Sequence, residues 1–208
     1  MVSVLRNKIL TEEFDYQILL DSLKKYKYPR DKIKKLLKSG DIIRIKKGIY
    51  IFGEKYRRNP FSREVLANMI YGPSYISLEY ALSYYGLIPE RIETVTSVTM
   101  KYNKRFSTPV GLFIYKHIPS YAYPYGIDIL EIGLNRSFLI AEAEKALIDK
   151  VYIDKNISLR SLKETKKYLF EDLRIDINQF KLLNSQKLKL YAEVYKLKKL
   201  SFIYKLLN

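Results

Sequence analysis

Residues 29–52 read PRDKIKKLLKSGDIIRIKKGIYIF, and this stretch decides the fold of the N-terminal part of the chain. Its first half has apolar residues at the i, i+3, i+4 spacing of one helix face, at Ile33, Leu36 and Leu37. Pro29 suits the first turn of a helix, and Ser39–Gly40 suits its C-cap. The pattern predicts a short helix with its basic residues on the outside.

The second half of the stretch predicts a β-hairpin. Isoleucines alternate with other residues on both sides of the basic turn Lys46–Lys47–Gly48, at Ile43, Ile45, Ile49 and Ile51. A helix followed directly by a two-stranded wing, with both elements basic on the outside, is typical of the DNA-reading half of a winged helix-turn-helix.

The residues before Pro29 supply the other helices of such a domain. Residues 2–10 have apolar side chains at Val2, Leu5 and Ile9. The next segment has Asp15 in position to cap a helix whose apolar stripe consists of Tyr16, Leu19, Leu20 and Leu23. We therefore expect a winged helix-turn-helix domain over residues 1–58, which is a usual size for this module.

Eight basic side chains of this domain are the expected contacts to duplex DNA. On the helix, the side chains expected in or beside the major groove are Arg30, Lys34, Lys35 and Lys38, and Lys32, which flanks the apolar face, is a further expected DNA contact. Those of the wing are expected to contact phosphates or the minor groove: Arg44, Lys46 and Lys47. Self-association of the protein on DNA stays open.

Charge is concentrated at the two ends of the chain. The sequence has 38 Lys+Arg and 22 Asp+Glu, a net charge of +16. Residues 1–58 hold 16 basic and 7 acidic side chains (+9), residues 59–154 hold 9 and 10 (−1), and residues 155–208 hold 13 and 5 (+8). Basic surface attracts phosphate whatever the base sequence. The N-terminal excess favours DNA binding, whereas the C-terminal excess fits solvated helix faces equally well.

Composition excludes several kinds of site. The chain has no cysteine, so it has no disulfide framework, no cysteine zinc site and no thiol nucleophile. No apolar run approaches the ~18–20 residues that span a bilayer. The N-terminal sequence MVSVLRNKILTEEF lacks the apolar core of a secretory signal. We expect a cytoplasmic protein that makes no membrane contact and carries no metal or other cofactor.

The middle of the chain predicts an α+β domain, counted from residue 59 to 208 and joined by a polar linker at residues 54–60. Strand patterns occur at residues 94–100, 110–118 and 126–134, with an extended segment at 137–140, which indicates a small, mostly antiparallel sheet. Helix patterns occur at residues 61–71, after the cap Ser77, and at 142–152. From about residue 155 the pattern is helical, and its expected caps are Ser158, Asp176 and Ser185.

Four segments carry a family resemblance. YISLEYALSYYGLIPE (75–90), TVTSVTM (94–100), FIYKHIP (113–119) and AEAEKALIDKVY (141–152) follow a wing that contains KKGIY (46–50). In this order and spacing, over about residues 10–155, they resemble the AbiEi family of antitoxins. The resemblance implies a type IV toxin–antitoxin system in which the N-terminal winged helix represses its own operon. It also implies that the second domain counters a nucleotidyltransferase-type toxin.

One string of residues suggests enzyme chemistry. Metal-dependent nucleases use acidic residues and a lysine, as in Glu142-Ala-Glu144-Lys145, together with an upstream carboxylate such as Asp128 or Glu131. Such a string usually lies on a strand, whereas residues 141–152 have helical spacing, which favours an ordinary helix start. The lone His117 cannot form a multi-histidine metal site. We therefore expect no catalytic residue.

The sequence thus predicts an antitoxin and operon autorepressor that is not an enzyme. Two alternatives remain. One is a plain winged-helix regulator whose second domain dimerises or senses a ligand, and the other is a metal-dependent nuclease.

Overall fold

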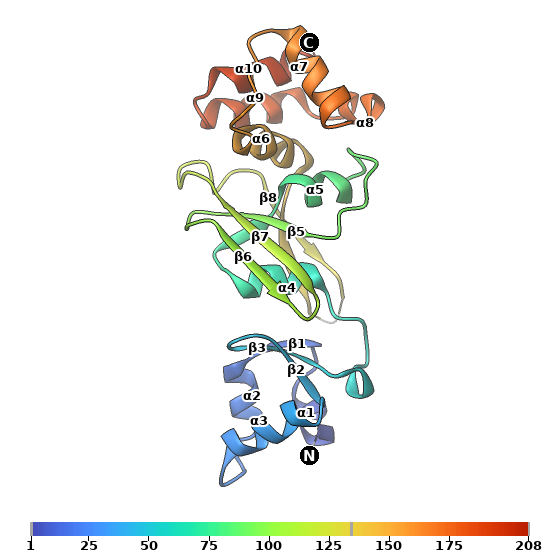
Figure 1. The fold of residues 1–208 in the computed structure, drawn as a ribbon, viewed down its shortest axis with the longest axis vertical. Coiled ribbons are helices and arrows are strands. Elements are labelled where there is room, and N and C mark those ends of the chain that lie inside the picture. Colours follow the sequence, from blue (N-terminus) through green and yellow to red (C-terminus); the bar gives the residue numbers. More distant parts are fainter. Residues whose placement is uncertain (1, 134, 208) are drawn as a thin grey trace.

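The computed structural model describes residues 2–133 and 135–207 as a mixed α/β protein. The molecule is elongated and has three tiers along its long axis (Figure 1). The N-terminal helices lie at one end, a six-stranded sheet lies in the middle, and the C-terminal helices lie at the other end. No helix of the described residues combines the length and the apolar character needed to cross a membrane.

Residues 2–58, called here the N-terminal unit, contain the predicted helix and hairpin. The elements in chain order are α1 (Val2–Lys8), β1 (Glu13–Asp15), α2 (Tyr16–Ser22), α3 (Pro29–Lys38), β2 (Ile42–Lys46) and β3 (Ile49–Phe52). Asp15 caps α2 as predicted, since its carboxylate accepts a hydrogen bond from the Ile18 amide at 2.8 Å. Strand β1 was not predicted, because its three residues acquire strand structure only by pairing with β3.

The antiparallel sheet β1-β3-β2 has a different apolar core on each face. One face packs on the helices of the N-terminal unit, with Phe14, Ile42, Tyr50 and Phe52 in that core. The other face presents Ile45, Ile49 and Ile51 to the large core of the remaining chain. The large apolar core therefore extends across residue 58, where the sequence predicted a domain boundary.

Residues 59–207, called here the second unit, are built on a mixed sheet of order β6-β7-β5-β4-β9-β8. Its strands are β4 (Ser74–Ile76), β5 (Val95–Thr99), β6 (Lys104–Thr108), β7 (Gly111–His117), β8 (Ile127–Glu131) and β9 (Ser137–Ala141). The pairs β4–β5, β6–β7 and β8–β9 are antiparallel, and β4–β9 and β5–β7 are parallel.

The sheet is larger and more mixed than the sequence predicted. Strands β4 and β6 were missed, and the extended segment at 137–140 is a full strand, β9. The strand predicted at 126–134 is β8, and Leu134 at its predicted end lies outside the described residues. A short 3-10 turn, η1 (Glu54–Tyr56), lies in the predicted linker.

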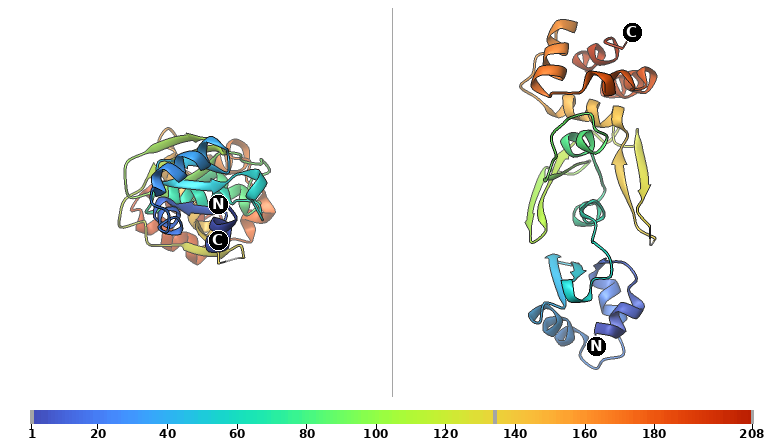
Figure 2. Two further views of the ribbon diagram at one scale, coloured as in Figure 1. Left: turned by 90° about the horizontal axis from the view of Figure 1, so that it is seen from below. Right: turned by 90° about the vertical axis from the view of Figure 1, so that its right-hand side faces the viewer.

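Helices α4 (Arg63–Ile70) and α5 (Leu78–Tyr84) pack on this sheet. Figure 2 (right) shows both helices between the β6–β7 end and the β8–β9 end of the sheet. Ser77 is at the N-cap position of α5, as predicted, but its hydroxyl does not cap the helix. The hydroxyl instead donates a charge-assisted hydrogen bond to the buried Asp149 carboxylate at 2.8 Å.

The helical tier contains α6 (Ala143–Ile153), α7 (Leu162–Lys167), the π-helical turn η2 (Tyr168–Asp172), α8 (Ile177–Lys181), α9 (Ser185–Val194) and α10 (Lys198–Tyr204). Asp176 caps α8 as predicted. The other two caps were wrong, since Ser161 caps α7 and Asn184 caps α9. The last predicted helix is divided in two at Lys196, whose φ of 54° is not helical.

Candidate nucleic-acid interface

Helix α3 lies at the N-terminal end of the elongated molecule (Figure 1), and its exposed side is basic. Its apolar side is buried at Ile33 and Leu36. Its basic side chains Arg30, Lys34, Lys35 and Lys38 are exposed, and Lys32 is partly buried. This separation follows from the helical repeat of about 100° per residue, as the sequence predicted.

One acidic residue lies on this surface. The Asp31 carboxylate is 3.5 Å from the Lys34 ammonium, and the two side chains are 62% and 79% exposed. A pair exposed to this degree contributes at most about 1 kcal/mol, so it holds the Lys34 ammonium only weakly.

Two tyrosines beside α3 belong to the same surface, and the sequence reasoning missed them. Tyr28 precedes the helix and is 61% exposed. The Lys32 ammonium lies 5.3 Å from the ring centroid of Tyr26, and the Lys27 ammonium lies 5.5 Å from that of Tyr28. Residues 25–28 have the sequence Lys-Tyr-Lys-Tyr, and basic residues interleaved with aromatic ones are a sequence signal of nucleic-acid contact.

On the hairpin, Arg44 lies on the same side as α3. It pairs across the sheet with Tyr50, whose ring belongs to the helix-side core. Burial raises the pKa of Tyr50, and the positive charge of Arg44 opposes that shift, which reflects their proximity. Arg44 is exposed, so it extends the basic surface of α3.

Lys46 was predicted to contact DNA, but its ammonium is engaged by residues of the second unit. Its ammonium donates to the carbonyl of Ile70 at 2.8 Å and lies 4.5 Å from the ring centroid of Phe106. Both partners belong to the second unit. The cause is a β-bulge between Arg44 and Lys46, which turns Lys46 to the opposite face of the sheet from Arg44.

Lys47 is exposed at the tip of the hairpin, as predicted. The tip itself is short and fixed. Gly48 has a φ of 90°, which only glycine adopts easily, and its carbonyl accepts from the Tyr16 amide at 2.8 Å. The turn is therefore held against the start of α2.

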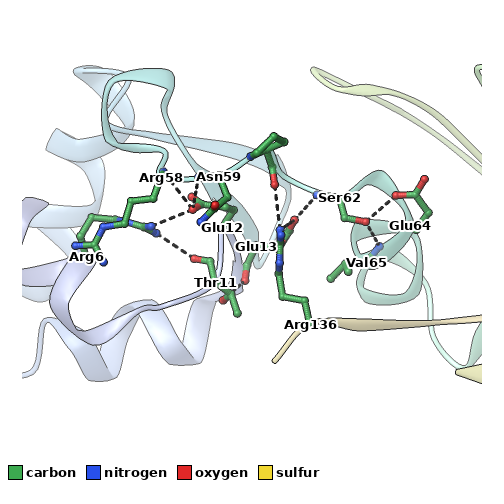
Figure 3. A network of polar contacts seen from close by, with 11 residues as sticks. Arg6, Thr11, Glu12, Glu13, Arg58, Asn59, Ser62, Glu64, Val65 and Arg136 are labelled. Carbon is green, nitrogen blue, oxygen red and sulfur yellow. Dashed lines mark hydrogen bonds and ion pairs between the residues drawn. The ribbon is translucent and has the colours of Figure 1, made fainter. Parts of the chain in front are cut away.

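Two consecutive glutamates hold the N-terminal unit against the second unit (Figure 3). The buried Glu12 carboxylate accepts from Arg6 at 2.9 Å and from the amides of Arg58 and Asn59 at 3.2 and 3.0 Å. The neighbouring Glu13 accepts from the Ser62 amide and pairs with Arg136 at 3.2 Å.

The Arg136 contact is specific in geometry. The side chains of Glu13 and Arg136 are 0% and 9% exposed, and Arg136 also donates to the Pro60 carbonyl at 3.0 Å. The attraction within a buried ion pair offsets the cost of desolvating both charges only when the geometry is good. Together with Lys46 and the apolar face of the hairpin, this network fixes the direction in which α3 faces.

The residues proposed for a nuclease site are engaged elsewhere. Glu142 accepts from Lys187 and Tyr191 at 3.0 and 2.6 Å, and Glu144 accepts from the Asn184 amide at 2.8 Å. Burial opposes ionisation of Glu142, but its two hydrogen bonds outweigh burial and lower its pKa. Among residues 2–133 and 135–207, no three His, Cys, Asp or Glu side chains form a group that could hold a metal ion. Asp128 and Glu131 are exposed on β8.

Lys145, the remaining member of that string, lies in a buried polar cluster. Its ammonium pairs with Asp149 and donates to the hydroxyls of Tyr75 and Tyr195 at 2.8 and 3.0 Å. Burial lowers the pKa of Lys145, and Asp149 opposes that shift. The cluster, which also includes Ser77, joins β4, α6 and α9, so its role in this structure is to connect elements.

His117 is exposed at the end of β7, and its Nδ1 lies 3.1 Å from the Lys101 carbonyl. Comparison of the sequence with models of known protein families found no match, and comparison with curated proteins found none either.

Proposed function

We propose that this protein is an AbiEi-like antitoxin and a DNA-binding autorepressor of a type IV toxin–antitoxin operon. In this proposal the N-terminal unit is a winged helix-turn-helix that binds duplex DNA of its own promoter. The second unit counters a nucleotidyltransferase-type toxin. The DNA contacts are the exposed cations of α3 together with Arg44 and Lys47, and no residue is assigned a catalytic role.

One observation carries the DNA-binding part of the proposal. A helix with a buried apolar side and an exposed row of cations lies at the free end of the molecule, beside the exposed Arg44. A helix about 10–12 Å wide fits the major groove of B-DNA, which is about 12 Å wide. The element order helix, strand, helix, helix and hairpin also supports a winged helix-turn-helix.

The antitoxin part is supported by the resemblance and by where its segments lie. The segments 75–90, 94–100, 113–119 and 141–152 contain β4 with α5, β5, β7 and α6. These elements pack on one another and share one apolar core. The segments that carry the resemblance therefore lie together in the second unit and include three strands of its sheet.

The experiment uses a triple variant, Lys34→Glu, Lys35→Glu and Lys38→Glu, because these three side chains are exposed and their loss leaves the apolar side of α3 intact. The matched control reverses three exposed lysines of the helical tier, Lys163, Lys166 and Lys167. In competition gel shifts with the native promoter, the triple variant should lose promoter binding and the control should retain it.

The same variants separate the two activities. Cells that express the neighbouring toxin should be rescued by wild type, by the control and by the triple variant, once soluble expression has been checked. Failure of the folded triple variant to rescue would show that protection acts through promoter binding, and the division of roles between the units would be wrong.

A second candidate is a winged-helix regulator whose second unit senses a ligand. The observation that favours it is a cleft of 1330 Å³ in the second unit, none of whose lining residues belongs to α3. A nucleotidyltransferase gene beside this one favours the antitoxin. Promoter binding that responds to a small molecule, without toxin rescue, favours the regulator.

A further inference from the structure

A large cleft lies between the sheet and the helical tier. Its floor comes from β5 and β7, where Ile114 and Lys116 lie on one face of the sheet because they are two residues apart in a strand. Its walls come from the end of α6, the segment after it and the start of α10, including Tyr152, Ile157 and Leu197. The volume of 1330 Å³ exceeds the usual 300–1,000 Å³ of small-molecule sites, so a ligand of nucleotide size fits.

The charges of the cleft favour an anion. Four lysines line it, Lys116, Lys155, Lys198 and Lys199, and so do two carboxylates, Glu79 and Asp154. Both carboxylates are bound by the ammonium of Lys150, at 2.7 and 2.8 Å. Lys150 thus offsets one of these two negative charges, and with the four lining lysines the cleft keeps a net positive charge.

Three of these lysines are available to a ligand. Lys199 is engaged, since it donates to the main-chain carbonyl of Asp154 at 2.9 Å. In the described part of the chain, no carboxylate lies within 4.0 Å of the ammonium groups of Lys116, Lys155 or Lys198. Lysine binds phosphate as a mobile point charge, and several lysines around one cleft suit a ligand with several negative charges.

The rest of the lining suits an apolar or aromatic group. Tyr152 stacks on Tyr195 with ring centroids 4.3 Å apart, which holds the Tyr152 ring in place at the wall. Ile92, Ile114 and Leu197 add apolar surface. A fixed aromatic ring is a stacking partner for a base, since every base has a π face.

We propose that this cleft binds a nucleoside polyphosphate, with its phosphates among Lys116, Lys155 and Lys198 and its base against Tyr152 and the apolar lining. The site is separate from α3, so the inference does not depend on DNA binding by the N-terminal unit.

The test measures binding of ATP and GTP to the full chain by isothermal titration calorimetry, with adenosine and inorganic triphosphate as the two partial ligands. Saturable binding of a nucleotide at one site is expected. Because each of these lysines is expected to make a charge-assisted hydrogen bond to a phosphate, Lys116→Gln with Lys198→Gln should weaken binding at least about tenfold. Tyr152→Leu should weaken nucleotide binding and leave triphosphate binding unchanged.

Two matched controls remove lysines elsewhere: Lys163→Gln with Lys189→Gln in the helical tier, and Lys34→Gln with Lys38→Gln on α3. Both should leave nucleotide affinity within about twofold of wild type. Absence of saturable nucleotide binding overturns the proposal, and so does an equal loss in the controls. If only a single-stranded oligonucleotide binds in a manner that depends on Lys116 and Lys198, the ligand is a polymer and the proposed class is wrong.

Discussion

Arg44 and Lys46 are two basic residues of one strand with opposite surroundings. Strict alternation would put both on the α3 side of the sheet, and the sequence analysis assigned both to DNA. The bulge between them moves only Lys46, whose ammonium then meets Ile70 and Phe106. A bulge is decided by the partner strand and by the surface behind it, so the alternation of residues 42–46 could not reveal it.

This difference predicts opposite effects of two single substitutions. Arg44→Ala should weaken binding to any duplex, because a phosphate contact is lost, and should leave thermal stability almost unchanged. Lys46→Ala should leave the DNA affinity, measured at the same salt concentration, close to wild type. It should lower the free energy of unfolding by about 1–2 kcal/mol, because its hydrogen bond to the Ile70 carbonyl is lost. Fluorescence anisotropy and urea unfolding measure the two effects. If Lys46→Ala weakened DNA binding and Arg44→Ala lowered stability instead, the hairpin would contact DNA through Lys46.

At the scale of elements, the sequence predicted those whose pattern is local. Helix α3, the hairpin, β5, β7 and α6 each carry their own apolar repeat, and each is present. Strands β1 and β4 have three residues each, and β6 is largely exposed, so none has a repeat long enough to recognise. These strands exist because a neighbouring strand pairs with them. Of the candidate DNA contacts, the helix positions followed from periodicity, whereas the orientation of Lys46 depends on tertiary structure.

The buried cluster around Lys145 joins α6 to β4 and α9, which gives a second prediction. Lys145→Met leaves the fully buried Asp149 carboxylate without its cation, and removal of one partner of a buried pair costs about 3–5 kcal/mol. The double variant Lys145→Met, Asp149→Leu removes both charges and should recover a large part of that loss. Urea unfolding of the three proteins measures the coupling. A double variant at least as unstable as the sum of both single variants would contradict the role given to the pair.

Over the whole molecule, buried tyrosines link stability to alkaline pH. Burial raises the pKa of several phenols from the ordinary 10.0, and raises that of Tyr85 to about 12, with Asp128 adding to the shift. Others shifted upward, with burial as the largest cause, are Tyr75, Tyr80, Tyr115, Tyr168, Tyr191 and Tyr195.

The folded state therefore binds more protons than the unfolded state once the pH exceeds 10. Since a raised folded-state pKa stabilises below the unfolded pKa, this stabilisation should be complete at pH 8–9 and should fall as pH rises from about 10 to 12. Urea unfolding at stepped pH, with tyrosinate absorbance recorded in parallel, tests this. Ionisation of most tyrosines near pH 10 without loss of structure would contradict it.

The arrangement of the two units also bears on function. Glu12, Glu13 and Arg136 bind the N-terminal unit to the second unit, and the hairpin shares the large core through Ile45, Ile49 and Ile51. A chain shortened to begin near Asn59 would expose this apolar face of the second unit and leave Arg136 unpaired. Charge variants on α3 therefore separate the two proposed functions more cleanly than truncation.

The central claim is that the cations of α3 neutralise DNA phosphates, and the salt dependence of binding tests it most directly. The dissociation constant for a fluorescent promoter duplex would be measured over a series of salt concentrations. Three proteins are compared. They are wild type, an α3 variant in which Lys34, Lys35 and Lys38 are all changed to Gln, and a control in which Lys163, Lys166 and Lys167 are all changed to Gln. Each phosphate contact adds about 0.9 to the log–log slope, so the α3 variant should lose up to about 2.7 and the control nothing. A flat response of wild type, or an unchanged slope in the folded α3 variant, would contradict the claim.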